Sequence, residues 1–483
     1  MSQSYAKQSA KGALWSMVER FSTMGIQLLC TIIIARFLSP DQFGLVGMIS
    51  IFMAFSMVII DSGFAQALIR DREPSQLDYS SVFYFNILVG TVIYIVAYIL
   101  APYISIFYKE PLLTLLIRVS FISMICLSLS VVQQARLFKN INFATVSKIS
   151  LISAILSGFS GIYCAYLFNN VWALIIQSVS FSVIRTMLFW IFGKWYPSFL
   201  FSWSSIKKYL SFSLNLLGTN MIASITDNLP NLLIGKYFNA SILAYYTLPE
   251  KLQRSIAGTI SFSIHRVSYP IMSSVQNDKE YLLSYCQKVV GMAFFIISPL
   301  MLIIGILSKP LIFSILSDEW IESAIYLRYL AIFGALYCFA DINMDILIVR
   351  GKTKQVFYLE LIRKLVFVLC LIVGTIYSIK VLLLMLVLYQ LFNSILVSYY
   401  AEKELNGSLA DLILSILPNL YCLIPMGILC AIVTKFNIPN TISVIIGFIT
   451  SIIIYLIIAY ITKNPYLLFC FSQLKQIIKH NNV

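Results

Sequence analysis

Residues 32–45, IIIARFLSPDQFGL, are matched 200 positions later by residues 232–245, LLIGKYFNASILAY. In this register Arg36 matches Lys236, and the turn former Ser39 matches Asn239. Each stretch predicts the end of one apolar helix, a tight turn and the start of the next helix. Taken alone, a chance match explains so short a similarity equally well. An internal repeat would indicate two related halves of a membrane protein, and the helix count favours that interpretation.

The composition indicates an all-α integral membrane protein. The chain has 483 residues, of which 60% are hydrophobic and 11% are charged, whereas soluble domains have about 25% charged residues. Apolar runs of about 20 residues recur throughout, and each is long enough to cross a hydrocarbon core of about 30 Å. The first run continues without a small-residue cleavage site, so we expect no cleaved signal peptide.

The runs predict about fourteen transmembrane helices. Six precede a polar, aromatic stretch at 194–208, six follow it, and a last pair precedes a basic tail. The predicted spans are 13–36, 43–69, 80–106, 111–134, 149–168, 171–192, 210–235, 240–265, 287–308, 321–348, 355–377, 379–400, 411–434 and 440–462. The predicted domains are an N-terminal six-helix lobe (1–193), an interfacial linker (194–208), a C-terminal six-helix lobe (209–403) and a terminal helix pair with the tail (404–483). In the linker Trp195, Tyr196 and Trp203 alternate with lysines, a pattern typical of a segment at the lipid headgroups.

The net charge of +14 follows from the topology. With both termini in the cytoplasm, 20 of the 34 Lys and Arg residues fall on the cytoplasmic side and 6 on the opposite side. Lys and Arg in short loops set the orientation of membrane proteins. The excess of positive charge therefore requires no nucleic acid or other polyanionic partner.

Histidine and cysteine usage argues against a metal or catalytic centre. Only two histidines are present, and the nine cysteines are odd in number and lie almost entirely within apolar runs. We interpret the cysteines as small hydrophobic residues. No cofactor or metal is expected.

Three runs resemble bacterial polysaccharide flippases of the multidrug/oligosaccharidyl-lipid/polysaccharide exporter superfamily. They are ARFLSPDQFGLVGMISIF (35–52), DSGFAQALIRDREPSQLDYSSVFYFNILVG (61–90) and NLLIGKYFNASILAYYTLPEKLQRSIAGTISFSIHRVSYPIMSSVQ (231–276). The individual motifs are degenerate, and their order and spacing carry the resemblance along nearly the whole chain.

The resemblance implies two helical bundles in a V-shaped arrangement that alternate between inward-open and outward-open forms. The implied cargo is an undecaprenyl-diphosphate-linked oligosaccharide repeat. It would move from the cytoplasmic to the periplasmic leaflet of the inner membrane, for O-antigen, capsule or exopolysaccharide assembly. The implied partners are membrane lipids, a polysaccharide polymerase and other assembly proteins.

Cations within the predicted spans are candidates for contact with the diphosphate. An ionisable residue near the bilayer centre costs at least about 2.5 to 3.5 kcal/mol on insertion scales, so it normally faces a partner or a wet cavity. The candidates are Arg20, Arg118, Arg185, Lys251, Arg254 and Arg328.

Local ion pairs are the alternative for some of these cations. Glu250 precedes Arg254 by four residues, and Glu360 precedes Arg363 by three, spacings that place partners on one helical face. Arg185 has no acid within four residues and lies 14 residues into its predicted span. At 1.5 Å per residue it is about 21 Å deep. Since the guanidinium fork can hold phosphate oxygens in bidentate fashion, Arg185 is the leading candidate.

Acidic residues are candidates for coupling to a proton or a sodium ion. Asp341 and Asp345 are four residues apart, where like charges repel unless one is protonated or a cation lies between them. The alternative, which we favour, is that both are solvated near the cytoplasmic end and face Arg350 or the lysines beyond it. Asp227 lies close to Pro230, which frees a backbone carbonyl, although a simple kink explains it equally well. Asp61 is interpreted as a structural cap.

Three other functions compete with a flippase. A multidrug or small-molecule exporter of the same superfamily would carry acids deep in its cavity, whereas the unpaired deep charges here are mostly cationic. A membrane polysaccharide polymerase or acyltransferase tends to carry a large outer loop or a histidine-centred site, and neither is predicted. A scaffold without transport leaves the arginines unexplained. We therefore expect a transporter and not an enzyme.

Overall fold

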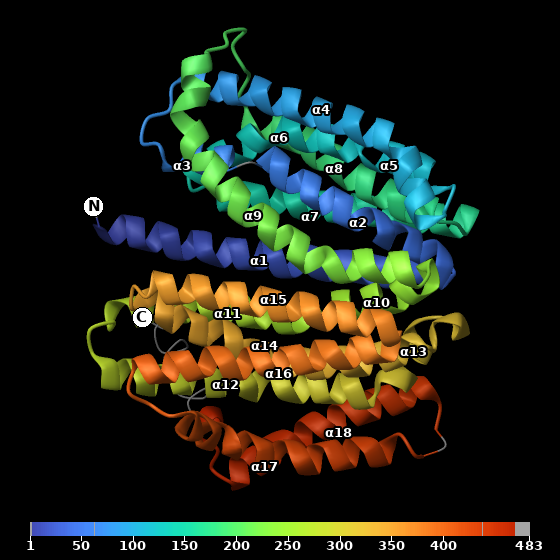
Figure 1. Ribbon diagram of the computed structural model, residues 1–483, viewed down its shortest axis with the longest axis vertical. Coiled ribbons are helices and arrows are strands. Elements are labelled where there is room, and N and C mark those ends of the chain that lie inside the picture. Colours follow the sequence, from blue (N-terminus) through green and yellow to red (C-terminus); the bar gives the residue numbers. More distant parts are fainter. Residues whose placement is uncertain (1, 62, 437, 469–483) are drawn as a thin grey trace. The chain divides into compact units, whose positions relative to one another are not determined.

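The computed structural model describes residues 2–61, 63–436 and 438–468, apart from the side chains of residues 2–14 and 215. Its described part is helical and divides into two compact units, Met1–Thr247 and Leu248–Val483. Figure 1 shows long helices running side by side within each unit. The predicted domain boundaries differ from this division and stay a prediction.

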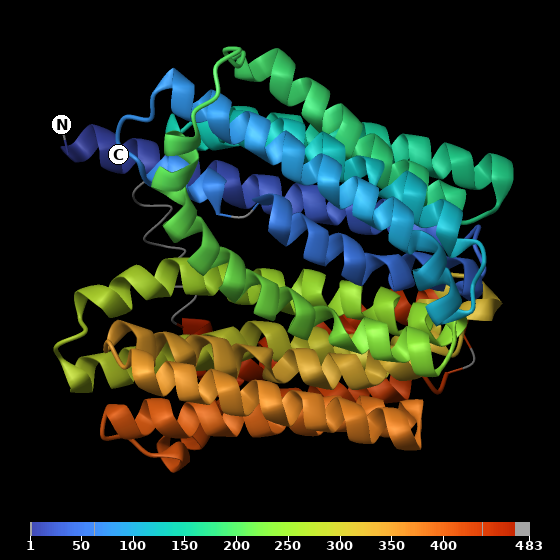
Figure 2. The same cartoon turned by 45° about the horizontal axis from the view of Figure 1, so that its top comes forward.

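The first unit contains nine complete α-helices among the described residues. They are α1 (Ser2–Ala35), α2 (Pro40–Asp61), α3 (Phe64–Arg70), α4 (Gln76–Tyr108), α5 (Leu113–Ser120), α6 (Ile122–Lys139), α7 (Phe143–Phe168), α8 (Trp172–Gly193) and α9 (Trp203–Tyr237). Helix α6 is central, in contact with α2, α3, α4, α7 and α8. Figures 1 and 2 show α9 alongside α2, against which it packs.

The second unit begins within α10 (Ala240–Gln253). It continues with a π-helical turn (Arg254–Gly258), α11 (Thr259–Ser274), α12 (Lys279–Ile306), α13 (Ser308–Ile315), a 3-10 turn (Asp318–Trp320), α14 (Ser323–Val349), α15 (Thr353–Tyr377), α16 (Ile379–Glu404), α17 (Leu409–Val433) and α18 (Asn440–Ile461). Helix α14 is central here. The terminal pair α17 and α18 packs on α12 and α13 and shares a buried hydrophobic core with α12 and α14.

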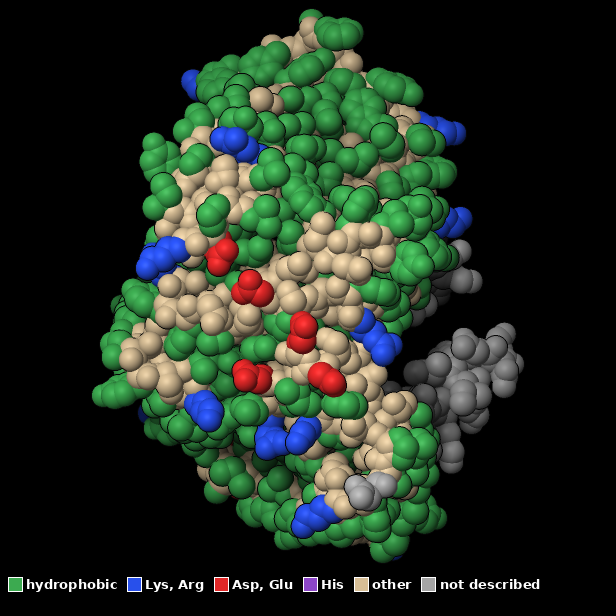
Figure 3. All heavy atoms as spheres, turned by 90° about the vertical axis from the view of Figure 1, so that its right-hand side faces the viewer, with side chains coloured by type: hydrophobic (Ala, Val, Ile, Leu, Met, Phe, Trp, Pro, Cys, Tyr) green, Lys and Arg blue, Asp and Glu red, His purple; other side chains and the backbone are tan. Residues whose placement is uncertain are grey.

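Eleven helical stretches of the described chain are long and apolar enough to cross a membrane. The other three predicted spans, 210–235, 240–265 and 355–377, coincide with α9, with α10 to α11 and with α15. The π turn interrupts the second of these, and Glu360, Arg363 and Lys364 raise the charge of the third. The exact number of fourteen therefore stays a prediction. Large hydrophobic side chains are exposed along many of these helices, as expected of a multi-pass membrane protein. Figure 3 looks onto one end of the helices, where Asp, Glu, Lys and Arg side chains lie among hydrophobic ones.

The two repeated stretches form the same capped turn. Helix α2 begins at Pro40, and the amide of Gln42 lies 3.5 Å from the Ser39 hydroxyl oxygen. Helix α10 begins at Ala240, and the amide of Ile242 donates to Asn239 Oδ1 at 2.7 Å. Side-chain caps of this kind satisfy amides that a helix start leaves without partners. The register of the repeat is thus confirmed at its turn formers.

The two turns also lie against each other inside the first unit. Ser241 Oγ donates to Asp41 Oδ1 at 3.2 Å. A Cβ atom added to Gly44 would lie 1.8 Å from the backbone oxygen of Ala240, so only glycine fits there. The repeat therefore supplies both sides of one helix contact.

Candidate functional site

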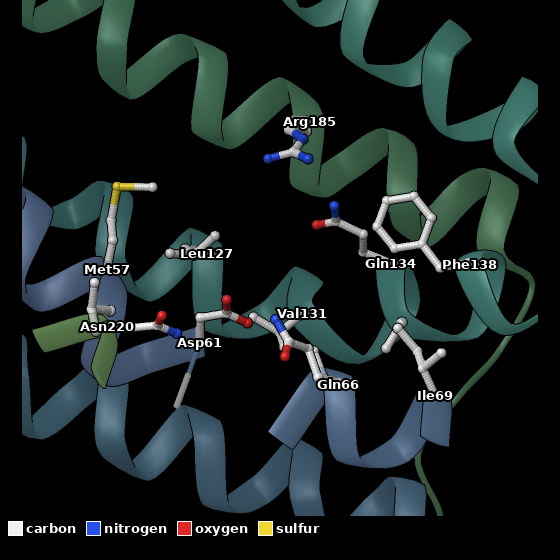
Figure 4. Close-up of a pocket in the computed structure, with 13 residues that line it drawn as sticks. Met57, Asp61, Gln66, Ile69, Leu127, Val131, Gln134, Phe138, Arg185 and Asn220 are labelled. Atoms are coloured by element: carbon white, nitrogen blue, oxygen red, sulfur yellow. The ribbon is translucent and has the colours of Figure 1, made fainter. Parts of the chain in front are cut away.

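A cavity of about 470 Å³ lies between helices of the first unit (Figure 4). Helices α2, α3, α6, α8 and α9 line it, and most of the lining is apolar. Five lining side chains are polar, one from each of these helices: Asp61, Gln66, Gln134, Arg185 and Asn220. This size and this mixture of an apolar wall with a few polar groups are typical of small-ligand sites.

Arg185 is the cation of this cavity. It lies on α8, and its guanidinium carbon is 5.3 Å from the ring centre of Phe189 and 5.9 Å from that of Phe181. These rings lie one turn away on either side along the helix, so they support the side chain by cation–π contact. Among the described residues Arg185 makes no ion pair within 4 Å, and its buried Nε has no hydrogen-bond partner. Glu19 of α1 acts on it electrostatically, while Glu19 Oε1 accepts a 2.6 Å hydrogen bond from Ser150.

A carboxylate and three amides complete the polar lining. In Figure 4, Arg185 and Gln134 point into the same space, and Asp61 and Gln66 lie across from Arg185. Asp61, which the sequence suggested was a cap, is thus a cavity residue at the end of α2. A guanidinium can bind an anion, whereas amides donate to and accept from hydroxyl groups. The cavity can therefore hold a ligand with both an anionic group and hydroxyl groups.

A polar network holds the end of α3, the helix that carries Gln66. Asp71 Oδ2 lies 2.6 Å from Lys208 Nζ and accepts a 2.7 Å hydrogen bond from Tyr209. These two partners lower the pKa of Asp71 to about 2. The bond to Asp71 in turn raises the pKa of Lys208. Lys139 donates to the backbone oxygen of Asp71, so α6, α3 and the start of α9 are joined beside the cavity.

The linker after α8 packs against this end of the unit. Trp195 was expected at the headgroups, yet it is only 5% exposed. Its Nε1 donates to Gln76 Oε1 at 2.7 Å, and its ring lies in a hydrophobic cluster with Phe83. Because the indole N–H has a partner, the whole side chain can be buried. Tyr196 and Trp203 are exposed, as a headgroup position would require.

The other two candidate cations of the first unit lie outside the cavity lining. The Arg118 guanidinium stacks over the ring of Tyr98 at 4.0 Å, which gives this cation a neighbour on α4. Arg20 is exposed on α1. The predicted cluster of cations is therefore represented in this cavity by Arg185 alone among the described residues.

One candidate cation of the second unit, Arg254, forms a local ion pair. Arg254 NH2 lies 2.9 Å from Glu250 Oε1, as the spacing predicted. Arg363 pairs in the same way with Glu360 at 2.6 Å. Lys251 and Arg328 are exposed on α10 and α14.

The candidate acids have different surroundings. Asp227 is exposed on α9, which continues through Pro230. Asp345 is buried and lies 3.1 Å from His265, whereas Arg350 pairs with Glu404. For Asp345 the favoured interpretation, a solvated acid facing Arg350 or the lysines beyond it, is therefore wrong, since Lys352 also pairs with Glu404. Asp341 acts electrostatically on Asp345 from the same helix.

Comparison with known families assigns the chain. A sequence profile described as "Polysaccharide biosynthesis protein" matches residues 33–325, which is more than half of this chain. The chain belongs to this family. The resemblance seen in the sequence is confirmed at that level.

Individual proteins also match most of the chain. The teichuronic acid biosynthesis protein TuaB of Bacillus subtilis is 24% identical over 74% of this chain and 74% of its own. The lipopolysaccharide biosynthesis protein WzxC of Escherichia coli is 23% identical over 84% of this chain and 83% of its own. Among solved structures, the lipid II flippase MurJ in an inward closed conformation has a TM-score of 0.74 at 16% identity, covering 96% of this chain and 100% of that one. At this identity the likeness shows a shared fold.

Sequence reasoning found the cation of the cavity and missed its other polar groups. Gln66, Gln134 and Asn220 carry no charge, so a search for ionisable residues passes over them. The signal was available, because amides are also uncommon and costly within apolar membrane helices. His265 gives no such signal in the sequence, because its partner Asp345 is 80 positions away.

Proposed function

We propose that this protein is a flippase for an undecaprenyl-diphosphate-linked oligosaccharide. It moves its cargo from the cytoplasmic to the periplasmic leaflet of the inner membrane by alternating access, for O-antigen, capsule or exopolysaccharide assembly. Family membership, the names of TuaB and WzxC, and the fold shared with a lipid II flippase support this role. It is a transporter and not an enzyme.

The observation that carries the proposal is the cavity of the first unit, lined by Arg185 and three amides. Arg185 would contact the diphosphate, because its fork matches two phosphate oxygens and its described surroundings leave it without a close ion pair. Gln66, Gln134 and Asn220 would hydrogen-bond the first sugar. A volume of about 470 Å³ suits a headgroup and part of a sugar chain but not a whole repeat unit.

The setting of this function is also a proposal. Both termini are cytoplasmic, as the distribution of Lys and Arg favours. The working domains are the two six-helix lobes 1–193 and 209–403, with the linker between them and the terminal pair after them. A polymerase and other assembly proteins are the partners, and a proton or sodium ion supplies the energy.

A flipping assay tests the proposal. The purified protein is reconstituted in liposomes with a fluorescent undecaprenyl-diphosphate oligosaccharide, and protection from a membrane-impermeant quencher is followed. Wild type should move the lipid, and Arg185→Ala should lose that movement while staying folded. Arg118→Ala is the matched control, since Arg118 stacks on Tyr98 outside the cavity lining. Equal loss in both variants would contradict the assigned role of Arg185.

One observation favours a second candidate, an exporter of cationic small molecules. Asp61 supplies a carboxylate to the same cavity, and a carboxylate attracts a cation. The two functions differ in which charge is required. In a flippase Asp61→Asn keeps movement of the lipid and Arg185→Ala loses it, whereas in an exporter Asp61→Asn abolishes drug efflux.

A further inference from the structure

A histidine and an aspartate meet in the second unit, on helices that are not consecutive. His265 lies on α11 and Asp345 on α14, and His265 Nδ1 is 3.1 Å from Asp345 Oδ2. The Asp345 side chain is 8% exposed and the imidazole is 43% exposed. The imidazole therefore lies between the buried acid and the accessible surface of the unit.

The distance requires a proton on one of the two groups. An unprotonated imidazole nitrogen and a carboxylate oxygen are both acceptors, and two acceptors at 3.1 Å repel each other. Neither atom has a hydrogen-bond partner elsewhere among the described residues. The contact is thus stable only while the pair holds at least one proton, on Nδ1 or on the carboxyl group.

The groups around the pair are acids and weak acids. On α14 itself, Asp341 acts electrostatically on Asp345, and Cys286 of α12 interacts with both Asp345 and Glu402 of α16. On α11 the ring of Tyr269 lies 5.5 Å from the imidazole ring. Beyond the end of α14, Arg350 and Lys352 are paired with Glu404. Among these groups the two cations are held by Glu404, and those that act on Asp345 are acids.

A proton suits this site better than a metal ion. No group of three or more His, Cys, Asp and Glu side chains in the described part of the chain could hold a metal. Hard cations prefer several oxygen ligands, whereas here a ring nitrogen faces the carboxylate. Proton relays in membrane transporters are built from Asp, Glu and His.

We infer that His265 and Asp345 form a proton-binding site in the second unit, with His265 exchanging the proton and Asp345 stabilising the charged imidazole. Its use in coupling rests on the proposed flippase function. The site itself does not, because proton binding can be measured without cargo.

Nuclear magnetic resonance with nitrogen-15-labelled histidine tests the site directly. The chain has only two histidines, His265 and His480, so in the His480→Gln protein every imidazole nitrogen signal comes from His265. Adding Asp345→Asn should lower the titration midpoint of His265 by about one pH unit, because the variant removes a negative charge that stabilises the protonated imidazole. Asp318→Asn, a change at an exposed acid in the 3-10 turn of the same unit, is the matched control and should leave the midpoint in place. An unchanged midpoint in Asp345→Asn, or a midpoint that follows sodium concentration, would overturn the inference.

The liposome assay tests the role of the site in transport. Wild-type flipping should change with pH across the range in which His265 titrates, and His265→Gln should lose at least half of that change. A His265→Gln profile identical to wild type would refute coupling at this site while the flippase proposal stands. If wild type moves no lipid, the flippase proposal fails and the resonance titration still decides the proton site.

Discussion

At the scale of single residues, two positions of the first unit each require one particular amino acid. Gly44 faces the backbone oxygen of Ala240, which cannot rotate away as a side-chain atom can. Asp71 holds Lys208 and Tyr209 with one carboxylate oxygen. The first position is set by space and the second by charge, so they should respond differently to substitution and to pH.

Gly44→Ala should destabilise the protein by about 1 to 3 kcal/mol, since an added methyl group forces backbone apart in a packed contact. Thermal unfolding of the detergent-solubilised protein measures the change. Gly218→Ala is the matched control, because a Cβ atom there meets nothing within 4 Å. A Gly44→Ala protein as stable as the Gly218→Ala protein would contradict the contact between the two repeated turns.

Asp71→Asn should lower stability near neutral pH and matter less in acid. The pKa of Asp71 is lowered to about 2 in the folded protein, against about 3.9 in an unfolded chain. The carboxylate therefore stabilises the fold above the unfolded value, and this contribution is lost as pH falls from about 5 towards 2. The difference in melting temperature between wild type and Asp71→Asn should shrink between pH 7 and pH 3, and Lys207→Ala serves as the neighbouring control. A difference that stays constant would exclude the ionised carboxylate as its cause.

At the scale of elements, the positions of most helices follow from the apolar runs, while their interruptions do not. Residue 63 breaks the predicted span 43–69, where Gly63 has a φ of 74° before α3. The π turn at Arg254–Gly258 interrupts the span 240–265. Such breaks depend on tertiary packing, which a run of apolar residues does not encode.

The contrast between local sequence and tertiary packing also explains how much of the candidate site was predictable. Arg185 could be found because charge is rare and costly within a span. Gln134, Asn220 and the partner of His265 could not be placed, because helix–helix pairing decides which faces meet. The linker shows this too, since Trp195 and Trp203 look alike in sequence, yet Trp195 is buried with its N–H bonded to Gln76 and Trp203 is exposed.

Trp195→Ala should destabilise the first unit by about 3 to 5 kcal/mol, the usual cost of removing a large buried aromatic side chain. The amount of folded protein and its melting temperature report the loss. Trp203→Ala is the matched control within the same segment, because Trp203 is 52% exposed. Similar losses in the two variants would show that the linker packs differently.

At the scale of the whole molecule, the orientation in the membrane is the property to test. An epitope tag inserted after Glu73, in the loop before α4, should be reached only from the cytoplasm. A tag inserted after Lys109, in the turn after α4, should be reached only from the periplasmic side. These loops lie at opposite ends of α4, so accessibility from the same side would disprove the proposed topology.

The packing of α9 has a consequence for biosynthesis. Helix α9 lies against α2, α3 and α4, and the following turn seats Ala240 on Gly44. When a nascent chain has emerged from the ribosome only as far as α8, the surfaces of α2 and α4 that α9 will cover are exposed to the lipid. The first unit can assemble during translation only once the segment up to Thr247 has left the ribosome. Split versions of the protein should therefore recombine better when cut after residue 247 than when cut within the linker.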